Sequence, residues 1–355
     1  MSQKLKVGMI GLGGICKYAH MHYYTKSQDV EIVAVCDIIP EKIDQFKENY
    51  KLDVNGYTDY KEMLEKEELD YIDICTPNYL HSIIAVDALN RGINVFCEKP
   101  DAVSVEEVLK MENAAKESGK HLMIMRNNRY RNTAKYLKKY IEDGSMGEIY
   151  CGRCGWQRRR GIPGRGGWFT NKEQSGGGPF IDLGVHMIDL SIWLMGNPTP
   201  VSVSGCTFSK FADSEDISDS VNSSFGEKNA DGVFDVEDLA MGFIRFDNGV
   251  CLQIEFSWAS NVDREYNYVE LRGTKAGATM KDGFVKIYTE KNGALVDEEP
   301  LTKDAGDEHA KNIAHFVDVI NGKAEPDFVP VQGVNMVKIL EAIYRSAETG
   351  REVVL

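Results

Sequence analysis

The sequence lacks any apolar run long enough to cross a membrane. No stretch of about 20 consecutive apolar residues occurs in the 355-residue chain, and a membrane-spanning helix needs roughly that many. The first apolar stretch, Val7 to Ile10, is also too short to be the core of a signal peptide. We therefore expect a cytoplasmic protein with no membrane partner.

Basic residues are outnumbered by acidic ones. The chain has 41 Lys and Arg against 55 Asp and Glu, a formal net charge of −14. Nucleic-acid binding depends on Lys and Arg that neutralise phosphates, so no nucleic-acid partner is expected. The only strong basic cluster is Arg158-Arg159-Arg160, which is either a solvated run or an anion clamp.

Cysteine and histidine pairs at zinc-binding spacing are also missing. The eight cysteines are scattered, which is typical of reduced, buried thiols rather than of disulfides. Cys151 and Cys154 form a C-x-x-C match, but positions i and i+3 of a strand point to opposite faces. His20 and His22 are expected at a helix surface or a pocket rim. No metal site is predicted.

The pattern of elements changes halfway along the chain. Apolar strand-like runs alternate with helical segments in the first half, at 6–10, 31–36, 71–75, 93–97 and 121–125. This alternation predicts a parallel sheet covered by helices on both faces. The second half has long β-rich runs at 149–156, 201–208, 240–246, 250–258, 266–273 and 284–288. With Asn248-Gly249 as a positive-φ hairpin turn and 209–235 as a surface loop, it predicts a mostly antiparallel sheet.

The first strand is followed by a near match to the dinucleotide-binding fingerprint, Gly11-x-Gly13-x-x-Cys16. Gly11 would allow a tight turn, and Gly13 would let a pyrophosphate approach the backbone at a helix N-terminus. Gly14 and Ile15 complete this turn. Cys16 stands where Gly or Ala is usual, and an ordinary glycine-rich turn is the alternative interpretation.

Asp37 ends the second strand, where the fingerprint requires an acidic residue. Its carboxylate would accept from the adenosine ribose hydroxyls and repel a 2′-phosphate, and neither Ile38 nor Ile39 supplies a cation. We therefore expect NAD rather than NADP. The alternative is a solvated Asp that begins the turn before Pro40.

Two further motifs carry proton chemistry. Lys99, in Glu98-Lys99-Pro100, follows a buried strand and can polarise a substrate oxygen at the sheet edge. Asp182 and His186 lie four apart in a predicted helix over 181–195, so they share a face on which the acid can orient the imidazole. A surface lysine and a helix-surface pair are the plain alternatives for each motif taken alone.

In this order, the glycine turn, Ile74-Cys75-Thr76-Pro77-Asn78-Tyr79-Leu80-His81, Glu98-Lys99-Pro100 and the glycine run before Asp182 and His186 resemble one family. It is the glucose–fructose oxidoreductase, inositol dehydrogenase and rhizopine-catabolism family, abbreviated Gfo/Idh/MocA. The resemblance covers nearly the whole chain. It implies an α/β protein with an NAD-binding Rossmann domain over 1–126. A substrate-binding and oligomerisation α/β domain with an open, mostly antiparallel sheet would follow over 127–355.

The resemblance also implies roles for matching residues. Lys99 would hold or polarise the reacting oxygen, His186 would accept the proton, and Asp182 would be its partner. The nicotinamide side would be lined by Thr76, Pro77, Asn78, His81 and Glu98. Asp101 departs from the family, in which a small or apolar residue commonly follows the Lys-Pro pair.

Substrate residues are expected in two places. Asn128-Arg129-Tyr130 follows the last strand of the first half, a corner that contacts substrate by resemblance. Trp168 lies in a glycine-rich segment that would form a loop over the active site, since tryptophan stacks on sugar C–H faces. A purely structural role for this Trp is the alternative.

The resulting hypothesis is an NAD-dependent dehydrogenase. It would move a hydride between nicotinamide and a ring hydroxyl or ketone of a sugar, sugar derivative or cyclitol. A redox-neutral glycosidase or lyase, acting through transient sugar oxidation on tightly held NAD, is the alternative. A non-catalytic dinucleotide sensor is a third. Apolar residues on both faces of strand 250–256 favour a homodimer or homotetramer.

Overall fold

The computed structural model describes residues 4–214, 220, 224–302 and 306–355. The chain forms two compact units. The first comprises Met1–Asn127 and His309–Val334, and the second comprises Asn128–Glu308 and Asn335–Leu355. The sequence predicted a single boundary between residues 126 and 127. In the structure, the later segment 309–334 also belongs to the first unit. Nothing in the apolar pattern of that segment marks which sheet it packs against.

The first unit is built on a six-stranded sheet whose strands all run parallel. The strand order is β3 (Asn55–Tyr57), β2 (Val30–Cys36), β1 (Leu5–Ile10), β4 (Tyr71–Ile74), β5 (Asn94–Cys97) and β6 (Leu122–Ile124). Every residue of β4 and β5 is buried, as expected for strands with helices on both faces. This confirms the predicted parallel α/β sheet. The short strand β3 was not predicted from the sequence, because Asn and Gly in Asn-Gly-Tyr have little β propensity.

Helices cover this sheet, and local signals explain several of their ends. Pro40 lies at the first turn of its helix, where its missing N–H costs nothing. Ser104 caps another helix by accepting from the Glu107 N–H at 3.3 Å, and Gly119 ends it at φ 65°. The helices are α1 (Met21–Tyr24), α2 (Pro40–Tyr50), α3 (Tyr60–Lys66), α4 (His81–Asn90), α5 (Val105–Ser118) and α9 (Glu308–Ile320). A π-helical turn, Cys16–His20, precedes α1, and a 3₁₀ turn, Asn78–Leu80, precedes α4.

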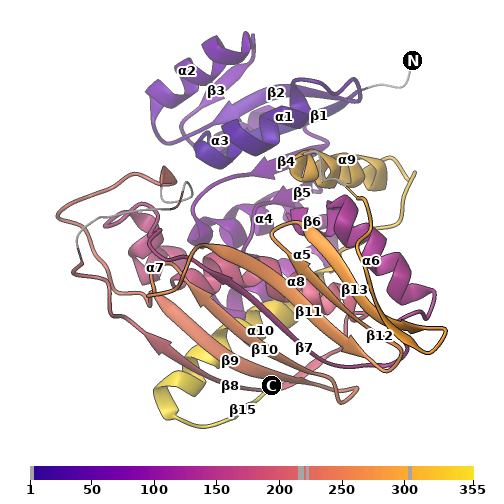
Figure 1. Ribbon diagram of the computed structural model, residues 1–355. Helices are drawn as coiled ribbons and strands as arrows, with labels where there is room; N and C mark the ends of the chain where they lie inside the picture. The colour runs from indigo at the N-terminus through magenta and orange to yellow at the C-terminus, as the bar shows by residue number, and fades with distance from the viewer. Residues whose placement is uncertain (1–3, 215–219, 221–223, 303–305) are drawn as a thin grey trace. The chain divides into compact units, whose positions relative to one another are not determined.

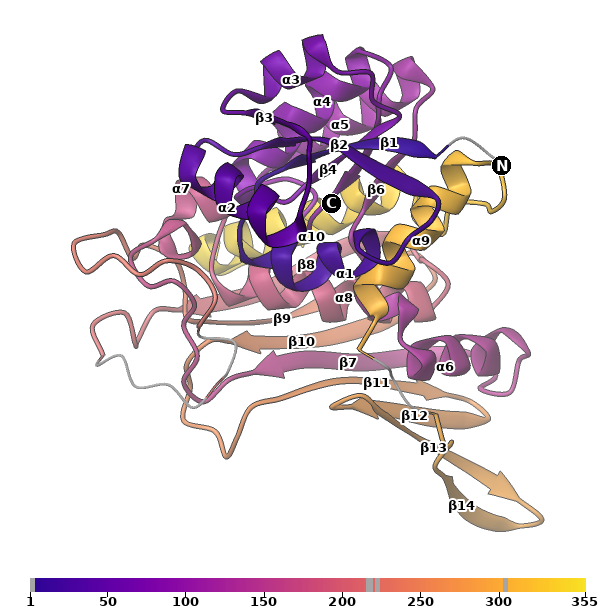
Figure 2. The same cartoon turned by 90° about the horizontal axis from the view of Figure 1, so that it is seen from above.

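The second unit is built on a nine-stranded sheet, and Figure 2 shows β7 and β9 to β14 side by side. Its order is β14 (Ala294–Glu298), β13 (Phe284–Lys291), β12 (Ala276–Lys281), β11 (Tyr266–Gly273), β7 (Ile149–Gln157), β10 (Cys251–Ser257), β9 (Leu239–Phe246), β8 (Pro200–Phe208) and β15 (Val353–Val354). Among the described strands of this sheet, only the β7–β10 pairing is parallel. The sheet is therefore mixed and mostly antiparallel, which confirms the predicted fold class.

One face of this sheet carries the core of the second unit. Leu252, Ile254 and Phe256 of β10 have no exposed surface, and they pack with α8 (Val185–Leu194) and residues 336–343 of α10 (Pro330–Thr349). Figure 1 shows α8 and α10 along the strands. The unit also contains α6 (Asn132–Glu142) and α7 (Lys172–Ser175).

The C-x-x-C pair of β7 lies as predicted, whereas the β9–β10 turn differs in part from its prediction. Cys154 is fully buried whereas Cys151 is half-buried, as opposite faces of β7 require. In the β9–β10 turn, Gly249 takes φ 85°, but Asn248 is not among the described residues with positive φ. The turn therefore needs only one left-handed residue.

The predicted surface loop lies between β8 and β9. Its described residues, 209–214, 220 and 224–235, contain no strand. The remainder of this loop, at 215–219 and 221–223, lies outside the described residues. In the described parts of the chain, no helix combines the length and the apolar character needed to span a membrane.

Candidate functional site

The turns that follow β1, β2, β4 and β5 lie at one edge of the first unit's sheet, because the strands are parallel neighbours. Backbone hydrogen bonds join these turns directly. Gly11 N donates to Cys36 O at 2.8 Å, Cys75 N to Ile10 O at 2.7 Å, and Glu98 N to Ile74 O at 2.9 Å. The predicted cofactor motifs of this unit are thus brought together, although they are distant in sequence.

The glycine turn has the shape that a phosphate site needs. Gly11 adopts φ 89°, and a Cβ there would lie 2.7 Å from the Cys75 carbonyl oxygen, so only glycine fits. A Cβ on Gly13 would meet no atom within 4 Å, which leaves its backbone open to a ligand. Cys16 is fully buried, so a thiol fills the packing position that is usually Gly or Ala.

Asp37 is held in place by backbone amides. Its Oδ2 accepts from Leu12 N at 2.9 Å, and its Oδ1 accepts from Ile39 N at 3.0 Å. The half-buried carboxylate is thereby fixed beside the glycine turn, and each oxygen keeps a further lone pair for a ribose hydroxyl. The neighbouring Ile38 side chain is 81% exposed and brings no charge.

The turn after β4 contains a buried polar atom with no hydrogen-bond partner among the described residues. Thr76 Oγ1 is buried without a hydrogen bond from the described residues, and such atoms are rare in proteins unless water or a ligand completes them. This atom and the open Gly13 backbone fit a dinucleotide. Asn78 is 7% exposed, and it begins the 3₁₀ turn that follows Pro77.

His81 joins two of these turns instead of facing outward. Its ring nitrogens lie 2.8 Å from the Pro100 carbonyl oxygen and 3.0 Å from that of Thr76. Burial lowers the pKa of this imidazole, against the smaller effect of the two carbonyls. The His81 ring therefore lies between the Thr76 turn and the Lys99-Pro100 turn, within hydrogen-bond distance of a carbonyl oxygen from each.

Glu98 is buried, and both of its oxygens are occupied. Oε1 lies 2.8 Å from His20 Nε2, and Oε2 accepts from the backbone N–H of Lys99 at 3.1 Å. The carboxylate therefore shapes the turn from which the half-buried Lys99 extends. This contact explains why an acidic residue stands at the end of β5.

His20 was expected at a helix surface or a pocket rim, and that expectation is wrong. Its side chain has no exposed surface, whereas His22 is exposed. The π-helical turn at Cys16–His20 has i→i+5 hydrogen bonds in place of the i→i+4 bonds of an α-helix, which changes the direction of the following side chains. No sequence signal distinguished this turn from a regular helix.

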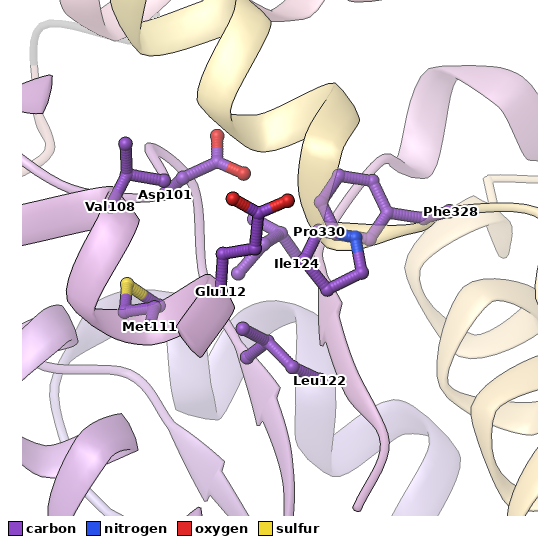
Figure 3. Close-up of a pocket in the computed structure, with 8 residues that line it drawn as sticks. All are labelled: Asp101, Val108, Met111, Glu112, Leu122, Ile124, Phe328 and Pro330. Atoms are coloured by element: carbon purple, nitrogen blue, oxygen red, sulfur yellow. The ribbon is translucent and has the colours of Figure 1, made fainter. Parts of the chain in front are cut away.

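The unusual Asp101 is neutralised inside the first unit. It is 1% exposed, and its Oδ2 accepts from Arg126 Nη2 at 2.5 Å. Its Oδ1 is buried without a hydrogen-bond partner from the described residues. Figure 3 shows the crevice beside it, which is lined by Val108, Met111 and Glu112 of α5, Leu122 and Ile124 of β6, and Phe328 and Pro330. This crevice has room for about one water molecule, so it is not a substrate pocket.

In the second unit, Asp182 and His186 lie where a π-helical turn, Phe180–Gly184, passes into α8. Both side chains are half-buried, whereas the residues on either side of each of them in the sequence are buried. Asp182 Oδ2 accepts from the indole N–H of Trp258 at 3.0 Å. The His186 ring lies 6.1 Å from the Trp156 ring, centroid to centroid. π-turns are frequent at functional sites.

The glycine run before this turn is clamped by a residue that the sequence did not reveal. The buried Glu237 accepts from Gly178 N at 3.0 Å, Phe180 N at 3.1 Å and the Tyr344 hydroxyl at 2.9 Å. Burial raises the pKa of Glu237, and the backbone N–H donors partly offset this. A Cβ on Gly178 would lie 2.0 Å from the Glu237 carbonyl oxygen, so glycine is needed for this close approach.

The corner with Asn128, Arg129 and Tyr130 is deeply buried. Arg129 is 1% exposed and grips Asp189 of α8 through two hydrogen bonds, Nε to Oδ2 at 2.8 Å and Nη2 to Oδ1 at 2.6 Å. Asn128 Oδ1 is buried without a hydrogen-bond partner from the described residues. Tyr130 is 2% exposed, with the Lys135 ammonium 4.7 Å from its ring centroid.

Arginine side chains hold the loop from 158 to 169 in place through hydrogen bonds. Arg158 binds Glu265 and the Gly161 carbonyl, and Arg160 binds the Ser260 carbonyl and Asn261. Only Arg159 of the cluster is exposed, which fits neither a solvated run nor an anion clamp. The half-buried Trp168 stacks on Phe169, with ring centroids 3.9 Å apart.

Comparisons with known proteins identify the family of this chain. Residues 5–125 match the sequence profile of the GFO_IDH_MocA oxidoreductase family with an NAD-binding Rossmann fold, and residues 138–355 match that family's C-terminal alpha/beta domain. The chain belongs to this family. Its first unit therefore contains the family's NAD-binding Rossmann fold.

Similar proteins include sugar dehydrogenases. The D-glucoside 3-dehydrogenase of Escherichia coli is 34% identical over 100% of this chain and 98% of its own length. The levoglucosan dehydrogenase of Pseudarthrobacter phenanthrenivorans is 28% identical over 77% of this chain and 72% of its own. A levoglucosan dehydrogenase structure with NADH and levoglucosan has the same fold, with a TM-score of 0.86 at 22% identity over 99% of both chains.

The Trp258–Asp182 hydrogen bond predicts a measurable coupling energy. Trp258→Phe removes the indole donor, and Asp182→Ala removes the acceptor. In a double-mutant cycle followed by urea unfolding, we expect a coupling of about 1–2 kcal/mol. The same cycle with Trp193→Phe, at a Trp whose ring contacts Lys138, should give less than about 0.5 kcal/mol. Equal coupling in the two cycles contradicts this bond.

Proposed function

We propose that this protein is an NAD-dependent dehydrogenase that oxidises a ring hydroxyl of a sugar, sugar derivative or cyclitol, or reduces the matching ketone. One observation carries the proposal. The parallel sheet brings Gly11, Asp37, Thr76 and Lys99 to the same edge of the first unit, so a phosphate cradle, a ribose acceptor and an ammonium group adjoin one cofactor. The 34% identical D-glucoside 3-dehydrogenase makes glucosides the first substrates to test.

In this proposal, the residues of the first unit bind the cofactor. The glycine turn with Gly14 and Ile15 binds the pyrophosphate, and Asp37 binds the adenosine ribose. The turn of Thr76, Pro77 and Asn78 lines the nicotinamide side. NAD supplies an acceptor for the hydride that leaves the sugar carbon.

The second unit supplies the proton acceptor. A hydride does not leave a neutral alcohol readily, so a base must take the hydroxyl proton as the carbonyl forms. His186 takes this proton, Asp182 orients its imidazole, and Lys99 stabilises the oxygen. Asn128, Arg129, Tyr130 and Trp168 are the substrate residues that we propose in the second unit, and Arg129 holds that corner on α8 through Asp189.

Cofactor choice is the first test. We expect NAD to bind more tightly than NADP, because the fixed Asp37 carboxylate repels a 2′-phosphate. Asp37→Ser should narrow the gap by roughly tenfold, or ~1.4 kcal/mol, as measured by titration of both cofactors. Equal or tighter NADP binding by the unaltered protein is the result that contradicts this assignment.

The proton acceptor is the second test. His186→Ala should lower kcat by about 10²–10⁴-fold with little change in NAD affinity, followed as NADH absorbance with a panel of glucosides, free sugars, sugar acids and cyclitols. Asp182→Asn should be milder if the carboxylate only orients the ring. Near-normal turnover and an unchanged pH profile in His186→Ala would assign the proton to Lys99 instead. Turnover without net NADH, on NAD that stays with the purified protein, would favour the redox-neutral alternative.

Self-association through the outer face of the second unit's sheet is the third test. On β10 that face is mostly polar, but Phe208 of β8, Phe243 of β9 and Tyr288 of β13 are 41%, 36% and 41% exposed on it. We expect a homodimer or homotetramer by light scattering at micromolar concentration, and Phe243→Glu should shift it toward monomer. A monomeric unaltered protein refutes the proposal.

A further inference from the structure

A buried histidine lies behind the Lys99 turn, bound to two carboxylates. His20 has no exposed surface, and its Nδ1 lies 2.7 Å from Asp73 Oδ2 while its Nε2 lies 2.8 Å from Glu98 Oε1. The Tyr24 hydroxyl donates to the same Asp73 oxygen at 2.8 Å. The proton transfer described above uses neither His20 nor Asp73.

The geometry determines the charge of this ring. A neutral imidazole has one N–H and can donate to only one carboxylate, whereas an imidazolium donates to both. Burial opposes the charged ring, but the Asp73 charge and the hydrogen bonds to Asp73 and Glu98 raise the pKa of His20 well above 6.5. Burial likewise opposes ionised Glu98, yet its bond to His20 lowers the pKa of this carboxyl to about 2. Two buried negative charges thus share one positive charge.

The other oxygen of Glu98 connects this cluster to the candidate catalytic lysine. Because Oε2 accepts from the Lys99 backbone N–H at 3.1 Å, any rotation of Glu98 moves the turn that carries Lys99. An uncompensated buried carboxylate is strongly unfavourable, so loss of the His20 donor would make Glu98 turn away or take up a proton.

We propose that His20 is a positioning residue, which as an imidazolium holds Glu98 and thereby fixes the backbone from which Lys99 acts. This inference rests on the proposed role of Lys99. His20, Asp73 and Cys75 lie close together and could in principle hold a metal ion. A metal ion there would need a deprotonated ring nitrogen of His20 as its ligand. The two hydrogen-bond distances to carboxylates favour the proton.

The pH range of the cluster follows from the two pKa shifts. The pKa of His20 is raised on folding, so its stabilising effect is complete below pH 6.5 and is lost as pH rises through the folded-state value. The pKa of Glu98 is lowered, so its effect is present above pH 4.5 and is lost as pH falls toward about 2. The cluster is therefore intact across neutral pH. Among the described residues, the other titratable groups around it include Cys16, Tyr24, Tyr71, Cys75, His81, Cys97, Lys99 and His309.

The first experiment reads the protonation of His20 without any enzyme assay. In protein with ¹⁵N-labelled histidine, the two His20 ring nitrogens should give imidazolium shifts that do not change from pH 6 to 8. The His20→Gln variant assigns the signals. Titration of His20 near pH 6.5, or metal in stoichiometric amount in the purified protein, overturns the proposal.

The second experiment measures the position of Lys99. Competitive acetylation with mass-spectrometric detection gives the reactivity and the pKa of the Lys99 amine in unaltered protein, His20→Gln and the control His22→Gln. We expect a changed Lys99 profile only in His20→Gln, together with a kcat on the order of 10–100-fold lower and a near-normal KM for NAD. If His20→Gln does not fold, Glu98→Gln takes its place, since its amide oxygen can still accept from Lys99 N.

The outcomes separate the two claims. An altered Lys99 profile in a protein that oxidises no sugar supports the positioning role and refutes the proposed function. A Lys99 profile and kcat that match the unaltered protein, in a folded His20→Gln variant, refute the positioning role and leave the proposed function standing.

Discussion

The hydrogen bond between His20 and Glu98 joins the helical segment after β1 to the end of β5. Around it, the candidate cofactor edge of the first unit is ordered by carboxylates that receive their donors from inside the protein. Asp37 is held by two backbone amides, and Asp73 by a ring nitrogen and a tyrosine hydroxyl. Buried carboxylates are tolerated only with such partners, so each one fixes the turn that supplies its donors. These hydrogen bonds fix the backbone of the glycine turn and of the Lys99 turn from inside the protein.

The second unit uses the same constraint with other partners. Glu237 gathers two backbone N–H groups and a tyrosine hydroxyl at the start of the π-helical turn, and Trp258 donates to Asp182 within that turn. Asp189 on the following helix is held by both arms of Arg129. Glu237, Trp258 and the Arg129–Asp189 pair thus set the direction of the segment that carries His186.

Local sequence patterns predicted most of the fold, because strands and turns are specified by neighbouring residues. Buried strands such as 122–124 have continuous apolar sequences, and the order of strand ends located Gly11, Asp37 and Lys99 at one edge. The short β3 gave no such signal. The roles of His20, Glu237 and Trp258 were not predictable either, because each depends on a partner 53 to 107 residues away. A lone buried histidine has the same local pattern as an exposed one, and a π-turn has the same composition as an α-turn.

The central claim is that a hydride moves directly between a sugar carbon and the nicotinamide. Its most direct test is to incubate the protein with NAD and a glucoside deuterated at its ring carbons, and to analyse the nicotinamide by mass spectrometry. The account predicts NADH that carries one deuterium at the reacting ring carbon of the nicotinamide, with a slower rate than for the unlabelled glucoside. NADH without deuterium, or no labelled NADH from glucosides, free sugars or cyclitols while NAD remains bound, would contradict it.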